Sequence, residues 1–178
     1  MSLLKDYRIK PDSKVSLKDF DPGDSGPFKD KNEAVKAVAS DRQKLVELQE
    51  RLYAEKQRSL LIVLQGMDTS GKDGTIAHVM SGVNPQGVQV TAFGPPSPEE
   101  LAHDYLWRVH QAVPSRGRLG IFNRSHYEDV LVVRVHQLVP EKVWRARYQQ
   151  INDFERQLSE SGTTILKFFL HISKDEQK

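Results

Sequence analysis

The stretch LIVLQGMDTSGKDGT, from Leu61 to Thr75, places two glycines and a lysine at the spacing G-x-x-x-x-G-K, namely Gly66, Gly71 and Lys72. A loop of this kind binds phosphate, because its backbone N–H groups and the positive N-terminus of the following helix attract phosphate oxygens. Lys72 adds a point charge that can reach the terminal phosphates. The alternative is an ordinary glycine-rich turn between a strand and a helix. An apolar run before the loop and a helical pattern after it favour the phosphate site.

Two carboxylates in this loop are unexpected. Asp68 lies inside the loop, and Asp73 stands where a serine or threonine usually holds magnesium. A carboxylate about 4 Å from a phosphate charge repels it by roughly 4 kcal/mol at an effective dielectric constant near 20. Mg²⁺ removes this repulsion, since it binds one or two carboxylates together with phosphate oxygens. We therefore predict that Asp68 is a metal ligand or orients the attacking phosphate. For Asp73 the alternative is simple stabilisation of a helix N-terminus.

A second cluster of polar residues lies in FNRSHYEDVLVVRVH, residues 122–136. Many phosphate-loop enzymes end the next functional strand with an acid that supports magnesium; Asn123 stands there instead and is a weaker, indirect partner. Arg124 follows at the carboxyl end of a predicted strand, where open α/β sheets place their ligands. It can neutralise charge on a transferring phosphoryl group, or it forms a surface salt bridge. Glu128 and Asp129 lie within reach of the same crevice.

The elements that must position these residues alternate between strand and helix. Strands are predicted at residues 60–65, 88–94, 118–122 and 163–172, and helices over 32–58 and 75–80 and from residues 97 and 140 onward. This alternation predicts βαβ units and a parallel sheet flanked by helices, a three-layer α/β/α fold. Residues 1–30, dense in Gly, Pro, Asp and Ser, are predicted to form an extended arm before one α/β domain over residues 31–178.

Several side chains are assigned structural roles. In SPEE, Ser97 and Glu100 form a predicted capping box. The apolar faces of the helices are assigned to Val38, Leu45, Leu48 and Leu52, and to Leu101, Tyr105, Leu106 and Val109. We place Trp107, Trp144 and Tyr148 in the core, and His126 in packing or hydrogen bonding. Arg108 is expected to pair with Asp104 one helical turn earlier.

Composition excludes several classes of protein. The chain has 178 residues, 26 basic and 24 acidic, so no overall charge favours nucleic acid. The absence of cysteine excludes disulfides and thiolate metal sites, and suits a cytoplasmic protein. No apolar run reaches the roughly 18 residues of a membrane span. The ending SKDE resembles a helix start with two residues after it, which indicates a chain incomplete at its C-terminus.

With both clusters in view, the sequence resembles the family-2 polyphosphate kinases from about Leu17 onward. The matching segments are GMDTSGKDGT, GVNPQG, SPEELAHDYLWR and FNRSHYEDVLVVRVH. The last segment is similar to the subclass that phosphorylates both nucleoside mono- and diphosphates. Other subclasses carry aspartate where Asn123 stands and asparagine where Glu128 stands.

The resemblance implies a P-loop kinase-like fold and phosphoryl transfer between inorganic polyphosphate and AMP, ADP, ATP or their guanine equivalents. It implies Mg²⁺, with Mn²⁺ as a possible substitute, and a homo-oligomer, dimer or tetramer, in which the helix over residues 32–58 is a possible contact. Asp68, Lys72 and Arg124 match the catalytic positions, with Asp68 at the metal. The expected phosphate- and nucleotide-binding set is Gly66, Met67, Thr69, Ser70, Gly71, Lys72, Asp73, Gly74, Asn123, Tyr127 and Glu128. The family's lid helix and further C-terminal elements are missing from this sequence.

Three further points stay open at the level of sequence. A polyphosphate groove needs several cations on one track, and the candidates are Lys29, Lys31, Arg116, Arg118 and Arg134. An ATP-dependent kinase of a small molecule would also use a phosphate loop. The third interpretation is a fragment without catalytic activity that binds phosphate or assembles into an oligomer.

Overall fold

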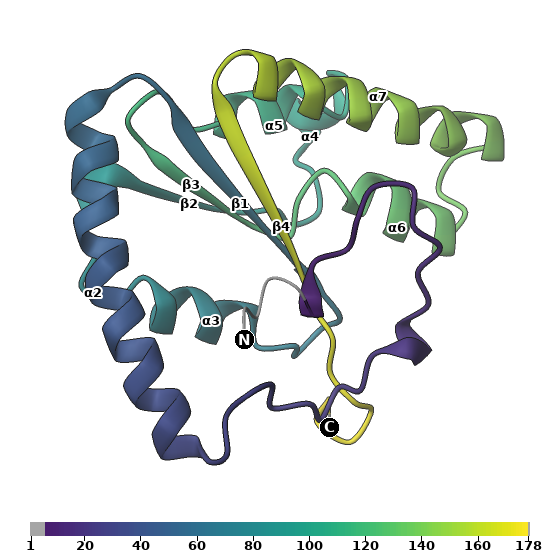
Figure 1. Ribbon diagram of the computed structural model, residues 1–178. Helices are drawn as coiled ribbons and strands as arrows, with labels where there is room; N and C mark the ends of the chain where they lie inside the picture. Colours follow the sequence, from purple (N-terminus) through teal and green to yellow (C-terminus); the bar gives the residue numbers. More distant parts are fainter. Residues whose placement is uncertain (1–5, 178) are drawn as a thin grey trace.

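The centre of the computed structural model, which describes residues 6–177, is a parallel sheet with the strand order β2-β3-β1-β4 (Figure 1). Its strands are β1 (Ser59–Gly66), β2 (Val88–Ala92), β3 (Leu119–Asn123) and β4 (Thr163–Leu170). All three pairings are parallel, as the alternation of elements predicts. Leu64 is level with Asn123, and Gly66 with Leu170. The phosphate loop and the second polar cluster therefore leave the sheet at the same edge.

Helices cover both faces of this sheet. They are α2 (Lys31–Glu55), α3 (Lys72–Val79), α4 (Pro98–Leu101), α5 (Trp107–Ala112), α6 (Glu128–Val135) and α7 (Glu141–Glu160), with 3₁₀ turns at Leu17–Asp19 and Pro85–Gly87. On one face the side chains of Leu61, Val63 and Phe122 pack with Val109 of α5 and Phe154 of α7.

On the other face Leu64, Leu119 and Ile121 pack with Ile76 and Met80 at α3. Alternate residues of β1 thus enter opposite cores, which is why this strand is apolar on both sides. The three-layer fold predicted from the sequence is confirmed.

The single helix predicted from residue 97 is interrupted. The capping box of Ser97 and Glu100 is present, but α4 ends at Leu101, whose side chain is 68% exposed instead of packed. The Asp104 carboxylate accepts the N–H of Leu106 at 2.9 Å. A short acidic side chain that binds the backbone in this way competes with helix hydrogen bonds, so the chain restarts as α5.

Asp104 is consequently not the partner of Arg108, contrary to our prediction. Arg108 donates to the carbonyl oxygen of Gly94 at 2.9 Å and lies 5.5 Å from the centre of the Phe93 ring. Its guanidinium is 3.7 Å from carboxylate oxygens of both Glu100 and Asp129. In the fold this arginine lies between Glu100 of α4 and Asp129 of α6 and covers the Phe93 ring.

Three aromatic side chains that we placed in the core are partly exposed. Tyr148 is 40% exposed, and Trp107 and Trp144 are half-buried. Trp107 stacks on the His103 ring at 4.2 Å, and Trp144 lies against the guanidinium of Arg145 at 5.0 Å. Helical spacing does not distinguish a large amphipathic ring at the edge of a core from one inside it.

The helix α2 corresponds to the one predicted over residues 32–58, although Leu48 of its apolar stripe is 58% exposed. The stretch before it, residues 6–30, contains the short 3₁₀ turn and loops out from the sheet before it reaches α2 (Figure 1). The Tyr7 hydroxyl donates to Asp24 at 2.8 Å, which joins the two ends of this loop.

After β4 the described chain ends in a turn at residues 174–177, where a helix start was predicted. The Ser173 hydroxyl accepts the N–H of Glu176 at 3.2 Å, the bond that a helix cap makes. Among the described residues, no helix is both long and apolar enough to cross a membrane.

Candidate active site

The phosphate loop joins β1 to α3 and forms the floor of a cavity of about 540 Å³. The cavity is lined by residues 68–74 of the loop, residues 92–94 after β2, and Asn123 and Arg124 after β3. Thr69, Gly71 and Arg124 have positive φ angles of 64°, 79° and 62°. A positive φ angle costs a non-glycine residue about 1–3 kcal/mol of conformational free energy. Residues in this conformation are concentrated at functional sites. Three strand ends therefore converge on one hollow with strained backbone at its rim.

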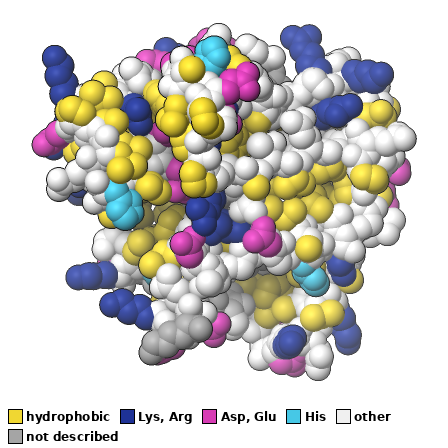
Figure 2. Space-filling view, turned by 180° about the vertical axis from the view of Figure 1, so that it is seen from behind, with side chains coloured by type: hydrophobic (Ala, Val, Ile, Leu, Met, Phe, Trp, Pro, Cys, Tyr) yellow, Lys and Arg dark blue, Asp and Glu magenta, His cyan; other side chains and the backbone are white. Residues whose placement is uncertain are grey.

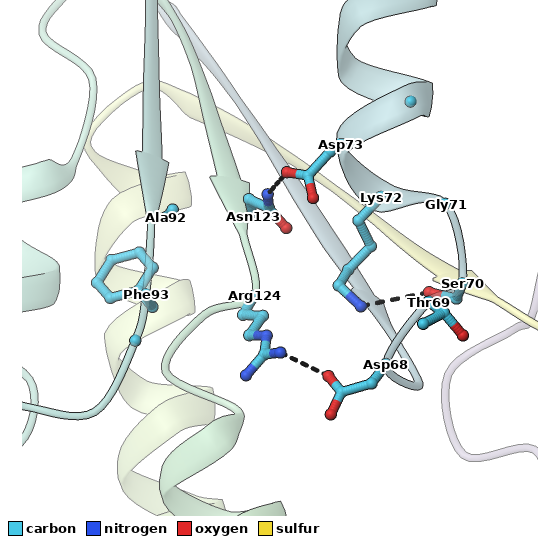
Figure 3. Close-up of a pocket in the computed structure, with 12 residues that line it drawn as sticks. Asp68, Thr69, Ser70, Gly71, Lys72, Asp73, Ala92, Phe93, Asn123 and Arg124 are labelled. Carbon is cyan, nitrogen blue, oxygen red and sulfur yellow. Dashed lines mark hydrogen bonds and ion pairs between the residues drawn. The ribbon is translucent and has the colours of Figure 1, made fainter. Parts of the chain in front are cut away.

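Lys72, the first residue of α3, points back into the loop (Figure 3). Its ammonium group donates to the carbonyl oxygens of Met67 at 2.8 Å and Gly66 at 3.1 Å, and lies 3.3 Å from the Ser70 hydroxyl. Only 7% of this lysine is exposed. The loop itself thus fixes a positive charge at the cavity floor, where a phosphate group can be bound.

Asp68 and Arg124 face each other across the mouth of the cavity (Figure 3). Arg124 Nη2 is 2.5 Å from Asp68 Oδ1, and the side chains are 40% and 77% exposed, respectively. The two roles considered for Arg124 are compatible, because the guanidinium that can contact a phosphoryl group also forms a salt bridge. An entering phosphate has to compete with Asp68 for this guanidinium, and surface ion pairs of this kind are weak.

Asp73 and Asn123 form the second contact across the cavity. The Asn123 amide donates to Asp73 Oδ1 at 2.6 Å (Figure 3). Asp73 lies in the first turn of α3, so the helix N-terminus favours its charge as well. The asparagine that replaces an acid at the end of β3 therefore supports the loop carboxylate directly.

The wall opposite the loop is formed by Ala92, Phe93 and Gly94, which were absent from our sequence-based set. Phe93 is buried edge-on against Phe122, with ring centres 4.9 Å apart. The Gly94 carbonyl is held by Arg108. Their position just beyond a predicted strand was the available clue, because ligands in parallel sheets bind at carboxyl ends of strands.

Four members of the predicted binding set do not line the cavity. Gly66 contacts it only indirectly, because its carbonyl oxygen accepts a hydrogen bond from the Lys72 ammonium group. Met67 is 54% exposed at the base of the loop. The carboxylate of Glu128 accepts a hydrogen bond from the Gln65 amide at 3.0 Å, and Gln65 in turn accepts one from the Ser125 hydroxyl at 3.2 Å. Tyr127 points toward α7. The binding roles of Met67, Tyr127 and Glu128 remain predictions.

Behind the cavity, Tyr127, Glu155 and Lys167 form a charged cluster. Burial raises the pKa of Tyr127 to about 12. Burial alone raises the pKa of the Glu155 carboxyl, but hydrogen bonds from His126, Lys167 and Tyr127 outweigh it and lower this pKa to about 2. Likewise, burial lowers the pKa of Lys167, whereas its bonds to Glu155 and Tyr127 raise it above the usual value. Glu155 is therefore a carboxylate and Lys167 an ammonium group at neutral pH.

His126 has the structural role that the sequence suggested. It is 1% exposed, packs edge-on against Phe154 at 5.4 Å, and its Nε2 is 3.3 Å from Glu155.

The described residues contain no group of three or more His, Asp or Glu side chains placed to hold a metal ion by themselves. A magnesium ion bound together with phosphates needs only one or two protein carboxylates. Asp68 and Asp73 both line the cavity, so the residues present fit an ion that is shared with a phosphate substrate.

The five cations considered for a polyphosphate groove do not line the cavity. Lys29, Lys31, Arg116 and Arg118 are exposed, and Arg134 lies 5.0 Å from the Trp144 ring. Near the centre of the face seen in Figure 2, basic and acidic side chains meet beside a hollow. The role of the five cations in a polyphosphate groove therefore stays a prediction.

A parallel sheet with a glycine-rich loop, a buried loop lysine and an arginine at the neighbouring strand end defines a P-loop kinase-like α/β protein. Residues 28–178 match the family model described as polyphosphate kinase 2. The chain belongs to this family.

Individual relatives agree with this assignment. The chain is 60% identical to an "AMP/ADP-polyphosphate phosphotransferase" of Meiothermus ruber, over 98% of this chain and 66% of the relative. It is 44% identical to an "ADP-polyphosphate phosphotransferase" of Rhodopseudomonas palustris, over 98% of this chain and 64% of the relative. The crystal structure of polyphosphate kinase 2 from Arthrobacter aurescens superposes with a TM-score of 0.89 at 47% identity, over 93% of this chain and 60% of that one. The chain thus spans about two thirds of the length of these relatives.

Proposed function

We propose that the protein transfers a phosphoryl group between inorganic polyphosphate and a nucleoside mono- or diphosphate, AMP and ADP above all. The observation that carries this proposal is the cavity at the strand ends, where the charges of Lys72 and Arg124 face the carboxylates of Asp68 and Asp73. The names of the relatives support polyphosphate and adenine nucleotides as substrates. The Asn123 and Glu128 pattern supports action on both AMP and ADP.

In this proposal each side chain has its own task. Lys72 is held at the cavity floor by two carbonyl oxygens, so its charge is in place before a phosphate arrives. Arg124 gives up Asp68 for the transferring phosphoryl group and offsets the charge that develops on it. Positioning and charge neutralisation account for this chemistry, so no covalent enzyme intermediate is needed.

Asp68 and Asp73 are the carboxylates that would hold Mg²⁺ or Mn²⁺ beside the phosphates. When bound, the cation supplies charge that offsets the repulsion between donor and acceptor phosphates. Asn123 keeps the Asp73 carboxylate turned toward the cavity. Asp68, with 77% of its side chain exposed, is free to turn from Arg124 to a new partner.

The decisive experiment compares phosphate donors. The protein is incubated with magnesium, AMP or ADP, and either long-chain polyphosphate or ATP, and the products are separated by chromatography. We expect ADP and ATP to form from polyphosphate. Transfer from ATP alone would indicate a conventional small-molecule kinase, and tight polyphosphate binding without transfer would indicate a phosphate-binding protein.

Asp68→Asn tests the metal assignment within the same assay. We expect a fall in turnover at fixed magnesium, partly restored as magnesium is raised. Asp41→Asn is a matched control. The Asp41 side chain is similarly exposed (73%) and pairs with Lys44 at 3.2 Å, and neither residue lines the cavity. Near-normal turnover of Asp68→Asn would remove this aspartate from the mechanism.

A further inference from the structure

The loop between β3 and α6 presents Arg124 to the cavity while its next three side chains point into the protein. Arg124 has a left-handed backbone, with φ of 62°, and its N–H donates to the Leu64 carbonyl at 3.0 Å. Ser125 and His126 are 0% and 1% exposed. Tyr127 is half-buried and reaches toward α7. The direction of the arginine therefore depends on how firmly the three following residues are held.

Glu155 holds the far end of this loop. The Tyr127 hydroxyl donates to Glu155 Oε1 at 2.7 Å, and His126 Nε2 approaches the same oxygen at 3.3 Å. Lys167 donates to Glu155 Oε2 at 2.6 Å and to the Tyr127 hydroxyl at 3.0 Å. The Glu155 side chain is 13% exposed. One carboxylate from α7 thus ties two successive loop residues to a lysine of β4.

We propose that Glu155 is a positioning residue for Arg124, acting through Tyr127 and His126. This inference rests on the proposed function, in which Arg124 contacts phosphate. A left-handed backbone relaxes to a more favourable conformation once its flanking residues are released. Loss of the carboxylate removes the acceptor of the Tyr127 hydroxyl, which keeps only its bond from Lys167. The arginine then leaves the orientation that faces the loop. Polyphosphate binding and transfer both decline, although Glu155 does not line the cavity.

A double-mutant cycle separates this role from a purely structural one. The variants are Glu155→Gln, Arg124→Ala and the two combined, each measured for tripolyphosphate binding by calorimetry and for transfer to ADP. We expect Glu155→Gln to lower kcat and tripolyphosphate affinity about tenfold, since small misplacements of a positioned group are costly. In the Arg124→Ala background the same change should have less than a twofold effect, because coupled residues are non-additive.

Two further variants complete the design. Asp153→Asn is the matched control on α7, since this carboxylate pairs with Arg156 at 2.8 Å on the outer surface, and it should match the wild type. Tyr127→Phe removes one hydroxyl but keeps the Glu155–Lys167 pair, so it tests the link if Glu155→Gln does not fold. It should reproduce the loss of affinity.

Equal losses from Glu155→Gln with and without Arg124 would overturn the inference, as would wild-type affinity and turnover in both Glu155→Gln and Tyr127→Phe. The binding measurements do not depend on turnover. If the wild type binds tripolyphosphate but transfers nothing to ADP, the proposed function fails while the binding cycle still decides the role of Glu155. If it binds no tripolyphosphate, both proposals fail.

Discussion

Replacing Gly66 by alanine should damage the phosphate loop by steric overlap alone. A Cβ added to Gly66 would lie 2.5 Å from the Ser70 hydroxyl oxygen and 2.9 Å from the Leu170 carbonyl oxygen. Leu170 is level with Gly66 in the pairing of β1 with β4, so its backbone cannot yield without opening the sheet. Ordinary contact begins at 3.4 Å, so the new Cβ has to move by about 0.5 Å from Leu170 and by about 0.9 Å from Ser70 in a tightly packed region.

Two losses follow from this shift. Overpacking of this kind costs about 1–3 kcal/mol, which lowers Tm by about 2–12 °C in a domain of this size. The Gly66 carbonyl and the Ser70 hydroxyl both contact the Lys72 ammonium group. Their displacement moves this charge, and we expect tripolyphosphate affinity to fall by about tenfold.

Differential scanning calorimetry and titration calorimetry measure the two effects. Gly74→Ala is the control, because no atom lies within 4 Å of its added Cβ and alanine favours a helix by up to about 1 kcal/mol. It should keep or raise Tm. Wild-type stability and affinity in Gly66→Ala, or an equal fall of Tm in Gly74→Ala, would refute the steric argument.

Three further predictions concern stability. The folded-state pKa of Glu155 is about 2, below the ordinary 4.5. Its ionisation therefore stabilises the fold by about 3 kcal/mol above pH 4.5, and this stabilisation is lost as the pH falls toward 2. In urea unfolding between pH 5.5 and 3, Glu155→Gln should depend less on pH than the wild type. Arg108→Met should cost about 1–3 kcal/mol, because the largely buried Asp129 loses this guanidinium and keeps only that of Arg147 at 3.6 Å. Arg156→Met on the surface should cost under about 1 kcal/mol in the same measurement. Ser97→Ala should lower the unfolding free energy by about 1 kcal/mol through loss of the cap, and an unchanged denaturation midpoint would contradict that role.

Local patterns were sufficient to identify the four strands, α2, α3, α7 and the phosphate loop. They gave no indication of α6, nor of the division of the helix predicted from residue 97 into α4 and α5. The strands coincide with apolar runs, and α7 begins right after Pro140, as predicted. Such features are encoded within a few residues, because backbone preferences and helix caps act over one turn. The same applies to the loop glycines and to the lysine that follows them.

Pairings between distant residues could not be read in this way. Asp68 meets Arg124 across 56 residues, and Asn123 meets Asp73 across 50. These contacts exist because β1 and β3 are neighbours in the sheet, and no local spacing encodes that adjacency.

The same limit explains the predictions that failed. Arg108 pairs with Glu100 and Asp129 because the predicted helix is interrupted at Asp104, whose carboxylate accepts the Leu106 N–H instead. Glu155 gave no sequence clue, since it lies on an ordinary amphipathic helix and acquires its role only where α7 crosses the loop after β3. The sequence by itself determined the four strands, most of the helices and the glycine-rich loop between β1 and α3. The tertiary structure decided which charges face one another, because that depends on which strands lie side by side.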